Sequence, residues 1–283
     1  AKGNQHAKGI SGTRLQQLVA NNRSYAPFVD ANNNGYYDPE NGDYPEIVGD
    51  QFIWWVFNDK GNVKQQTQTE AIGLEIQASA FAFSRKDALN DATFYRYRLI
   101  NRSNLTLDST YIATWTDADL GYAFDDYIGC DTARGLGILY NGKSEDGSGQ
   151  INSYGNQVPM VGVDFFEGPK RYFPHPNDPS RDTFEVLGME GFYYYNNDFS
   201  RIGNPSNGQH IYGYMTGTTR GGQRFTYDWD GIAGSNSFAL GTGPLVKYVF
   251  SGDPGNSSEW SECACNNLPQ DRRFVHSSGP FRL

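Results

Sequence analysis

Three segments between residues 72 and 115 constrain the fold more than any other feature of the chain. In residues 72–83, Leu74 and Ile76 begin one face that alanines continue at every second position, and residues 93–100 and 107–115 alternate in the same way. A period of two residues is typical of β-strands, because successive side chains point to opposite faces of a sheet. Long alternating strands joined by polar turns favour antiparallel sheets. We therefore expect an all-β fold, an antiparallel β-sandwich with long loops.

Other segments extend this expectation. Gln51–Asn58 is almost continuously apolar and aromatic, which predicts a buried strand. Aromatic residues make up 15% of the chain and there are 33 glycines, a composition that suits many strands joined by turns. Ser11–Ala20 is the one predicted helix. Further strands are expected at residues 135–140, 209–215, 246–250 and 273–276, and residues 168–182 are expected to be irregular.

Oxygen-bearing side chains between Asp30 and Asp43 have the spacing of a calcium-binding loop. They recur at alternate positions, and a glycine follows at the sixth position of the pattern. Calcium takes roughly six to eight oxygen ligands, which a tightly curled chain supplies from alternate residues. Gly35 permits the sharp bend. The predicted ligands are Asp30, Asn32, Asn34, Tyr36 through its backbone carbonyl, Asp38 and Asp43.

The end of this loop departs from the helical EF-hand. An EF-hand closes with a glutamate at its twelfth position, which is Asn41 in this chain. Asp43 is the better closing ligand, and Asp43-Tyr44-Pro45 leads into strand-like sequence. We therefore predict a compact calcium turn at the entry to a β-domain. The alternative is a solvated Asn/Gly turn without a metal, because these residues favour turns for local reasons.

Residues 115–131 form a second acidic region, in which five aspartates are interleaved with glycines. Like charges packed in an ordered loop repel one another, and a divalent cation neutralises them. The alternatives are an exposed acidic loop, turn-capping aspartates or a pair of catalytic carboxylates. Adjacent residues of a strand point to opposite faces, so a glycosidase pair fits poorly. The predicted metal ligands in this region are Asp117, Asp119, Asp125, Asp126 and Asp131.

Charge and hydropathy exclude several classes of partner. The net charge of −9 comes without a basic cluster, so nucleic acid is not an expected partner. No apolar run is long enough to span a membrane.

Neither a repeat nor a long linker divides the chain, so we expect one domain over residues 28–283 after an N-terminal segment, residues 1–27. The chain begins with Ala1 and ends in strand-like sequence, so we expect it to be part of a longer polypeptide.

The sequence gives little support for catalysis. No nucleophile elbow, phosphate-binding loop, zinc-protease motif or dinucleotide-binding motif occurs, so an enzyme is not the leading hypothesis.

Cys130 can form a disulfide with Cys263 or Cys265, which leaves one thiol. Exposed aromatic side chains would instead provide a platform for sugar rings. Tyr193–Tyr195 are the best surface candidates for this role, followed by Trp54, Trp55 and Trp229.

Several short motifs occur together over residues 28–283. They are Asp43-Tyr-Pro45, Gln51–Asp59, Ile72–Gln77, Asp117–Gly121, Asp126–Asp131 and Asp271–Phe274. Together they resemble a group of large secreted proteins of Bacteroidota, generally exported by the type IX secretion system and carrying a C-terminal sorting domain. The resemblance implies the outer cell surface or the medium as the location, and contact with the secretion machinery during export. It implies no defined biochemical activity.

The sequence therefore predicts a secreted or cell-surface β-sandwich module that calcium stabilises. Its expected role is structural or adhesive, and its expected partners are other cell-surface proteins or glycans. Two alternatives stay open. One is a carbohydrate-binding module that uses exposed tyrosine or tryptophan side chains, and the other is a hydrolase of polysaccharide or peptide that uses the carboxylates of residues 117–131.

Overall fold

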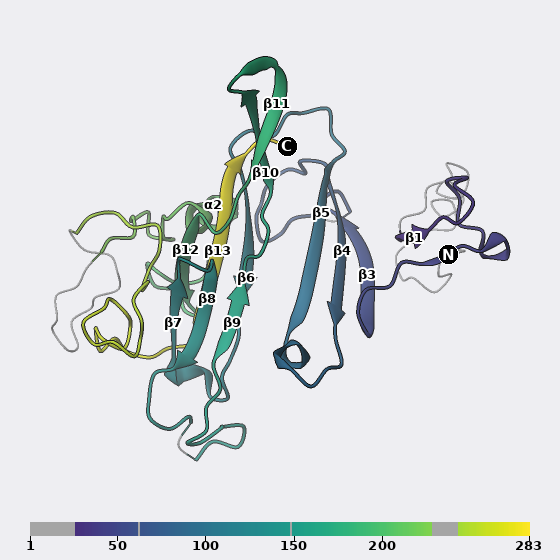
Figure 1. The fold of residues 1–283 in the computed structure, drawn as a ribbon. Helices are drawn as coiled ribbons and strands as arrows, with labels where there is room; N and C mark the ends of the chain where they lie inside the picture. Colours follow the sequence, from purple (N-terminus) through teal and green to yellow (C-terminus); the bar gives the residue numbers. More distant parts are fainter. Residues whose placement is uncertain (1–25, 62, 148, 228–242) are drawn as a thin grey trace. The chain divides into compact units, whose positions relative to one another are not determined.

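The computed structural model describes residues 26–61, 63–147, 149–227 and 243–283 (Figure 1). The predicted helix at Ser11–Ala20 and Trp229 lie outside the described residues. The chain divides into two units. Unit 1 comprises residues 1–63 and 71–105, and unit 2 comprises residues 64–70 and 106–283. Antiparallel sheets build the described part of both units, which confirms the all-β prediction, whereas the sandwich arrangement stays a prediction.

Unit 1 contains a three-stranded antiparallel sheet in the order β3-β4-β5 and the short pair β1-β2. The sequences of β4 and β5 alternate with a period of two, because successive side chains of a strand point to opposite faces of the sheet. Two 3-10 turns, η1 and η2, lie in the connections. The bounds are β1 Phe28–Val29, η1 Pro39–Asn41, β2 Tyr44–Pro45, β3 Gln51–Asn58, β4 Leu74–Ala82, η2 Ala88–Asp91 and β5 Thr93–Asn101.

β3 is a strand as predicted, but it is not buried. It lies at an edge of its sheet, and Ile53 is 66% exposed. A continuous apolar run does not by itself state which of its faces is covered.

Unit 2 contains two three-stranded antiparallel sheets, in the orders β12-β13-β6 and β7-β8-β9, and the hairpin β10-β11. The hairpin turn projects beyond the ends of the two sheets (Figure 1). One α-helix, α2, lies within the described residues of this unit. The bounds are β6 Thr110–Thr116, η3 Ala123–Asp125, β7 Asp126–Asp131, β8 Leu136–Asn141, β9 Val161–Asp164, β10 Lys170–His175, β11 Asp178–Val186, β12 Gly191–Asn196, α2 Gly208–Met215 and β13 Arg272–Phe281.

The core of unit 2 takes side chains from both of its three-stranded sheets. Leu139 of β8, Phe192 of β12 and Phe274 of β13 are fully buried in one cluster. A Cβ added at Gly137 of β8 would lie 2.4 Å from Nε2 of His276 on β13, so the two strands approach one another too closely for a side chain there. The close packing of the two strands therefore requires glycine at position 137.

Two predicted strands of unit 2 are wrong. Residues 209–215 form the helix α2 because Asn207 caps it, accepting a hydrogen bond from His210 N at 2.9 Å. Residues 246–250 run beside β12 with a single parallel bridge, Phe192 to Tyr248, and the positive φ of Phe250 (52°) ends the extended backbone. This segment covers the open edge of β12 without forming a regular strand.

The expectation of irregular structure at residues 168–182 is also wrong. Residues 170–186 form the β10-β11 hairpin, in which Tyr172 pairs with Phe184 and Arg171 with Glu185. Pro174 does not prevent the pairing, because it lies next to a register shift, where a strand tolerates proline.

The three cysteines are free thiols, so the disulfide that the sequence permits is not formed in this structure. Cys130 and Cys265 are buried in the core and Cys263 is exposed. Cys130 Sγ lies 3.6 Å from the carbonyl oxygen of Val249 and packs as a small apolar group.

Within the described residues, no helix has the length and apolar character needed to cross a lipid bilayer.

Candidate metal centres

The Asp30–Asp43 loop joins two paired strands of unit 1. Val29 pairs with Tyr44, and Phe28 with Pro45, so both ends of the loop are held side by side. Asp43 is 4% exposed, although it lies in a polar loop. The strand pairing therefore holds the two ends of the loop together, so that the predicted ligands lie in one closed loop.

Backbone N–H groups hold the carboxylates at the two ends of this loop. Asp30 Oδ1 accepts from Asn34 N at 3.1 Å, and Asp30 Oδ2 accepts from Gly35 N at 2.7 Å. Asp43 Oδ1 accepts from Ala31 N at 2.9 Å, and its Oδ2 accepts from Asp38 N at 2.8 Å. Gly35 has φ +80°, the left-handed conformation that the sharp bend requires. The residue predicted to close the loop does connect its start to its end.

Asp38 forms the polar centre of the loop. The Nδ2 groups of Asn34 and Asn41 donate to Asp38 Oδ2 at 2.8 and 2.9 Å, and Asn32 Nδ2 donates to Oδ1 at 3.3 Å. These amide donors, Asn41 first, hold the pKa of Asp38 below its usual value. In this arrangement the amide N–H groups stabilise the negative charge of Asp38. If the side-chain amides of Asn32 and Asn34 rotated by half a turn, their oxygen atoms would face the loop interior and could bind a cation. Tyr36, the remaining predicted ligand, donates its backbone N–H to Asn34 Oδ1 at 2.7 Å and so belongs to the same loop.

The structure separates the aspartates of the second acidic region into three places. Asp117 and Asp119 lie together after β6, Asp125 and Asp126 lie together at the start of β7, and Asp131 ends β7. Asp131 accepts backbone N–H groups from the turn that follows and forms an ion pair with Arg134, which lowers its pKa. Its geometry is that of a turn-capping residue.

Asp117 and Asp119 lie beside Asp271, which is not one of the predicted ligands. The carboxylate oxygens of these three residues all lie within 4.8 Å of one another, a grouping that could hold a metal ion. Burial raises the pKa of Asp119, with Asp271 and Asp117 adding to the effect. Arg273 supplies a built-in positive charge, because its guanidinium lies 2.6 Å from Asp271 and 3.1 Å from Asp117. The triad therefore has less need of a cation than three bare carboxylates would have.

Asp125 and Asp126 are each 1% exposed and lie beside Asp146, which is fully buried. Burial, together with the charges of neighbouring carboxylates, Asp125 first, raises the pKa of Asp126 to about 8. Gly121 (φ +72°) leaves room for Asp146, since a Cβ there would lie 2.0 Å from Asp146 Oδ2. The loop after β8 and the loop before β7 thus enclose three carboxylates out of contact with solvent.

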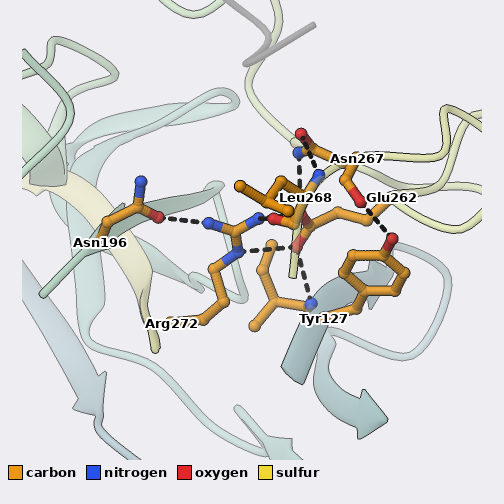
Figure 2. Close-up of polar contacts among 7 residues, drawn as sticks. Tyr127, Asn196, Glu262, Asn267, Leu268 and Arg272 are labelled. Atoms are coloured by element: carbon orange, nitrogen blue, oxygen red, sulfur yellow. Dashed lines mark hydrogen bonds and ion pairs between the residues drawn. The ribbon is translucent and has the colours of Figure 1, made fainter. Parts of the chain in front are cut away.

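A buried ion pair fixes the strand that carries Asp126 (Figure 2). Glu262 Oε1 accepts from Arg272 Nε at 3.2 Å and from the backbone N–H of Ile128 on β7 at 2.9 Å. Tyr127 of the same strand donates its hydroxyl to the carbonyl oxygen of Asn267. Residues 262–268 are therefore connected to β7 and, through Arg272, to β13. No local sequence signal marked Glu262 as a buried residue.

The tyrosine side chains predicted to form an exposed platform for sugar rings are buried. Tyr193, Tyr194 and Tyr195 are at most 5% exposed, so they belong to the core and are not available as a surface. Trp54 lines a groove in unit 1 with a volume of about 420 Å³, and Trp55 points to the opposite face of β3. Of these candidates within the described residues, Trp54 alone lines this groove.

Neither a family model, nor a curated protein, nor a solved structure matches this chain.

Proposed function

We propose that this chain is a non-enzymatic, calcium-stabilised β-rich module of a secreted or cell-surface protein, with a structural or adhesive role. The Asp30–Asp43 loop carries the proposal. Its ends are joined by strand pairing, its terminal carboxylates are aligned by backbone N–H groups, and its alternate oxygen-bearing residues surround Asp38. The location rests on the sequence resemblance described above and is compatible with the acidic charge of the chain.

Calcium would stabilise the fold by binding the closed loop and not the unfolded chain. A ligand present at one hundred times its dissociation constant adds about 2.7 kcal/mol to the free energy of unfolding. The loop precedes the three-stranded sheet of unit 1 directly, so its closure would fix the entry to that sheet. This is a structural role and requires no chemical step.

The burial of Asp125 and Asp126 counts against the hydrolase alternative. Both carboxylates are 1% exposed, so a polysaccharide or peptide cannot contact them without opening of the surrounding loops. A glycosidase also needs two carboxylates that face one accessible cleft.

Thermal unfolding in calcium and in EGTA tests the proposal. We expect calcium to raise the midpoint of the wild-type chain, and the double variant Asp30→Asn/Asp38→Asn to show a clearly smaller rise. Asp91→Asn is the control, because it makes the same kind of substitution at one exposed aspartate of unit 1 outside the loop and should behave as wild type. Equal calcium-dependent shifts in the wild type and the double variant would refute a calcium loop at residues 30–43.

A second candidate function, binding of an acidic carbohydrate, is favoured by the groove of unit 1. Trp54, Ser79 and Arg96 form one row across the sheet, and Arg98 lies two residues further along β5 on the same face. All four line the groove. An indole stacks on the apolar face of a sugar ring, while a guanidinium pairs with a carboxylate in a bidentate manner.

Calorimetric titration with oligogalacturonate and with an uncharged oligosaccharide of the same length tests this second candidate. Trp54→Ala should abolish binding of the acidic oligomer, and Trp55→Ala, on the other face of the strand, should leave it unchanged. No heat of binding with either oligomer would remove this candidate.

A further inference from the structure

Three buried side-chain oxygen atoms, where β7 begins and the neighbouring strand β8 ends, have no hydrogen-bond partner within the part of the chain that the structure describes. They are the Oδ1 atoms of Asp125, Asp126 and Asn141. Each is an acceptor, and buried acceptors are nearly always paired with a donor in folded proteins. Burial of an ionised carboxylate without a positive partner is especially unfavourable. A cation or, for the two carboxylates, a proton would satisfy these atoms, because the described side chains around them supply no donor.

The three residues lie next to one another. Asp126 is the direct partner of Asn141 in the β7-β8 pair. Side chains in such a pair share one face of the sheet, with Cβ atoms about 4.5–5.5 Å apart. The carbonyl oxygen of Asp125 accepts from Gly142 N at 2.6 Å, so Asp125 lies against the same end of β8.

The other polar atom of each side chain is already engaged. Asp126 Oδ2 accepts from Leu120 N at 3.2 Å, and Asp125 Oδ2 accepts from Gly147 N at 3.0 Å. Asn141 Nδ2 donates to a backbone carbonyl at 2.8 Å. This bond orients the amide so that its oxygen, rather than its N–H groups, is left in the interior. Each of the three side chains is thus held by one hydrogen bond to the backbone, while its Oδ1 atom has no partner among the described residues.

Positive charge near this cluster is limited. Lys143 Nζ lies 3.8 Å from Asp125 Oδ2, but the lysine side chain is 56% exposed, and such pairs contribute little. Asp146 adds a further buried carboxylate, whose oxygens accept the N–H groups of Tyr122 and Tyr154. Two carboxylates and one amide, all offering oxygen, suit a hard divalent cation such as calcium.

We propose that Asp125, Asp126 and Asn141 bind one calcium ion through their Oδ1 atoms, with water or backbone carbonyl oxygens completing its coordination. The site gives the acidic region of unit 2 a specific ligand set and adds Asn141 to it. This deepens the proposed calcium-stabilised function but does not depend on the Asp30–Asp43 loop, which belongs to unit 1. Asp146 positions the two loops and is not a ligand.

Calcium titration of the full chain by calorimetry, after removal of metal with EGTA, tests this site. The background is the Asp30→Asn/Asp38→Asn variant, so that binding at the loop does not contribute. We expect this background to retain one calcium ion per chain. Adding Asp126→Asn should weaken binding by at least about tenfold, because it removes a charged ligand without changing size. Asp131→Asn, on the same strand, is the matched control and should leave the dissociation constant unchanged.

A second variant keeps the test valid if Asp126→Asn fails to fold. Asn141→Asp retains the oxygen and adds a negative charge, so calcium should raise its melting midpoint by more than that of the background. The proposal is overturned if the background binds no calcium, if Asp126→Asn binds as tightly as Asp131→Asn, or if calcium fails to shift the midpoint of Asn141→Asp. A proton shared by Asp125 and Asp126 would give the first of these results. Loss of the loop site alone would contradict the Asp30–Asp43 proposal and leave this one intact.

Discussion

Arg272 and Glu262 form an ion pair in which both side chains are fully buried, and two guanidinium nitrogens contact the two carboxylate oxygens at 3.2 and 2.5 Å. Asn196, Asn267 and the backbone of Leu268 and Ile128 satisfy the remaining donors and acceptors around them (Figure 2). The pair joins β13, β7 and the intervening loop. It fixes the position of the strand that carries Asp126, but it contacts none of the proposed metal ligands through its side chains.

Removal of one partner from this pair should be strongly destabilising. Arg272→Met leaves the Glu262 carboxylate buried without a counter-charge, and we expect a loss of about 3–5 kcal/mol in the free energy of unfolding. The exposed pair of Arg171 and Glu185 is the matched control, and Arg171→Met should cost less than about 1 kcal/mol. Urea unfolding followed by tryptophan fluorescence measures both. Similar losses in the two variants would contradict the role given to the buried pair.

Folding stability should fall between pH 6.5 and pH 4 because of His276. Burial lowers the pKa of this histidine to about 4, and Thr114 Oγ1 lies 2.9 Å from its Nδ1. The unfolded chain binds the proton first as pH falls, so stability present above pH 6.5 is lost on acidification, by about 3 kcal/mol in total.

His276→Gln, which has no titrating ring, should lose this part of the pH dependence. His175→Gln should retain it. Urea unfolding of the three proteins at pH 7.5, 5.5 and 4.5 gives the comparison, and a His276→Gln profile that is parallel to wild type would contradict the assignment.

The thiols should differ sharply in reactivity. Cys263 is exposed, whereas Cys130 and Cys265 are each 3% exposed, and burial raises the pKa of Cys130 to about 12. A disulfide reagent at pH 8 should therefore modify one thiol in the folded chain and all three in urea. Cys263→Ser should abolish the fast reaction. Only one reactive thiol in urea would mean that a disulfide exists after all.

Gly137 should not tolerate a side chain. A Cβ at this position would lie 2.4 Å from His276 Nε2 and 2.8 Å from the Phe192 ring, so β8 and β13 must separate in Gly137→Ala. We expect a loss of about 1–3 kcal/mol, which is typical of overpacking in a core. Gly188→Ala, where a Cβ would meet no atom within 4 Å, should change stability by less than about 0.5 kcal/mol. Thermal unfolding of both variants would show the difference, and equal midpoints would contradict the close approach of the two strands.

Strands could be predicted from the sequence where their side chains alternate between apolar and polar and where they pair with the next strand along the chain. The predicted segments at residues 51–58 and 93–100 correspond to β3 and β5, because period-two patterning is a local property. The helix at Gly208–Met215 was missed, since a short aromatic segment fits either structure and a single cap residue decided the outcome. Burial of Tyr193–Tyr195 was missed as well, because β13 pairs with one edge of β12 and residues 246–250 cover the other.

The sequence by itself determined the all-β class, the turn chemistry of residues 30–43 and the acidic character of residues 117–131. Each depends on residues within a few positions of one another, where spacing and backbone preference act directly. The tertiary structure decided which carboxylates meet. It placed Asp271 beside Asp117 and Asp119, and Asn141 beside Asp126, across separations at which local rules carry no information. Whether an oxygen is buried without a donor depends on every segment packed around it, so that property exists only in the folded chain.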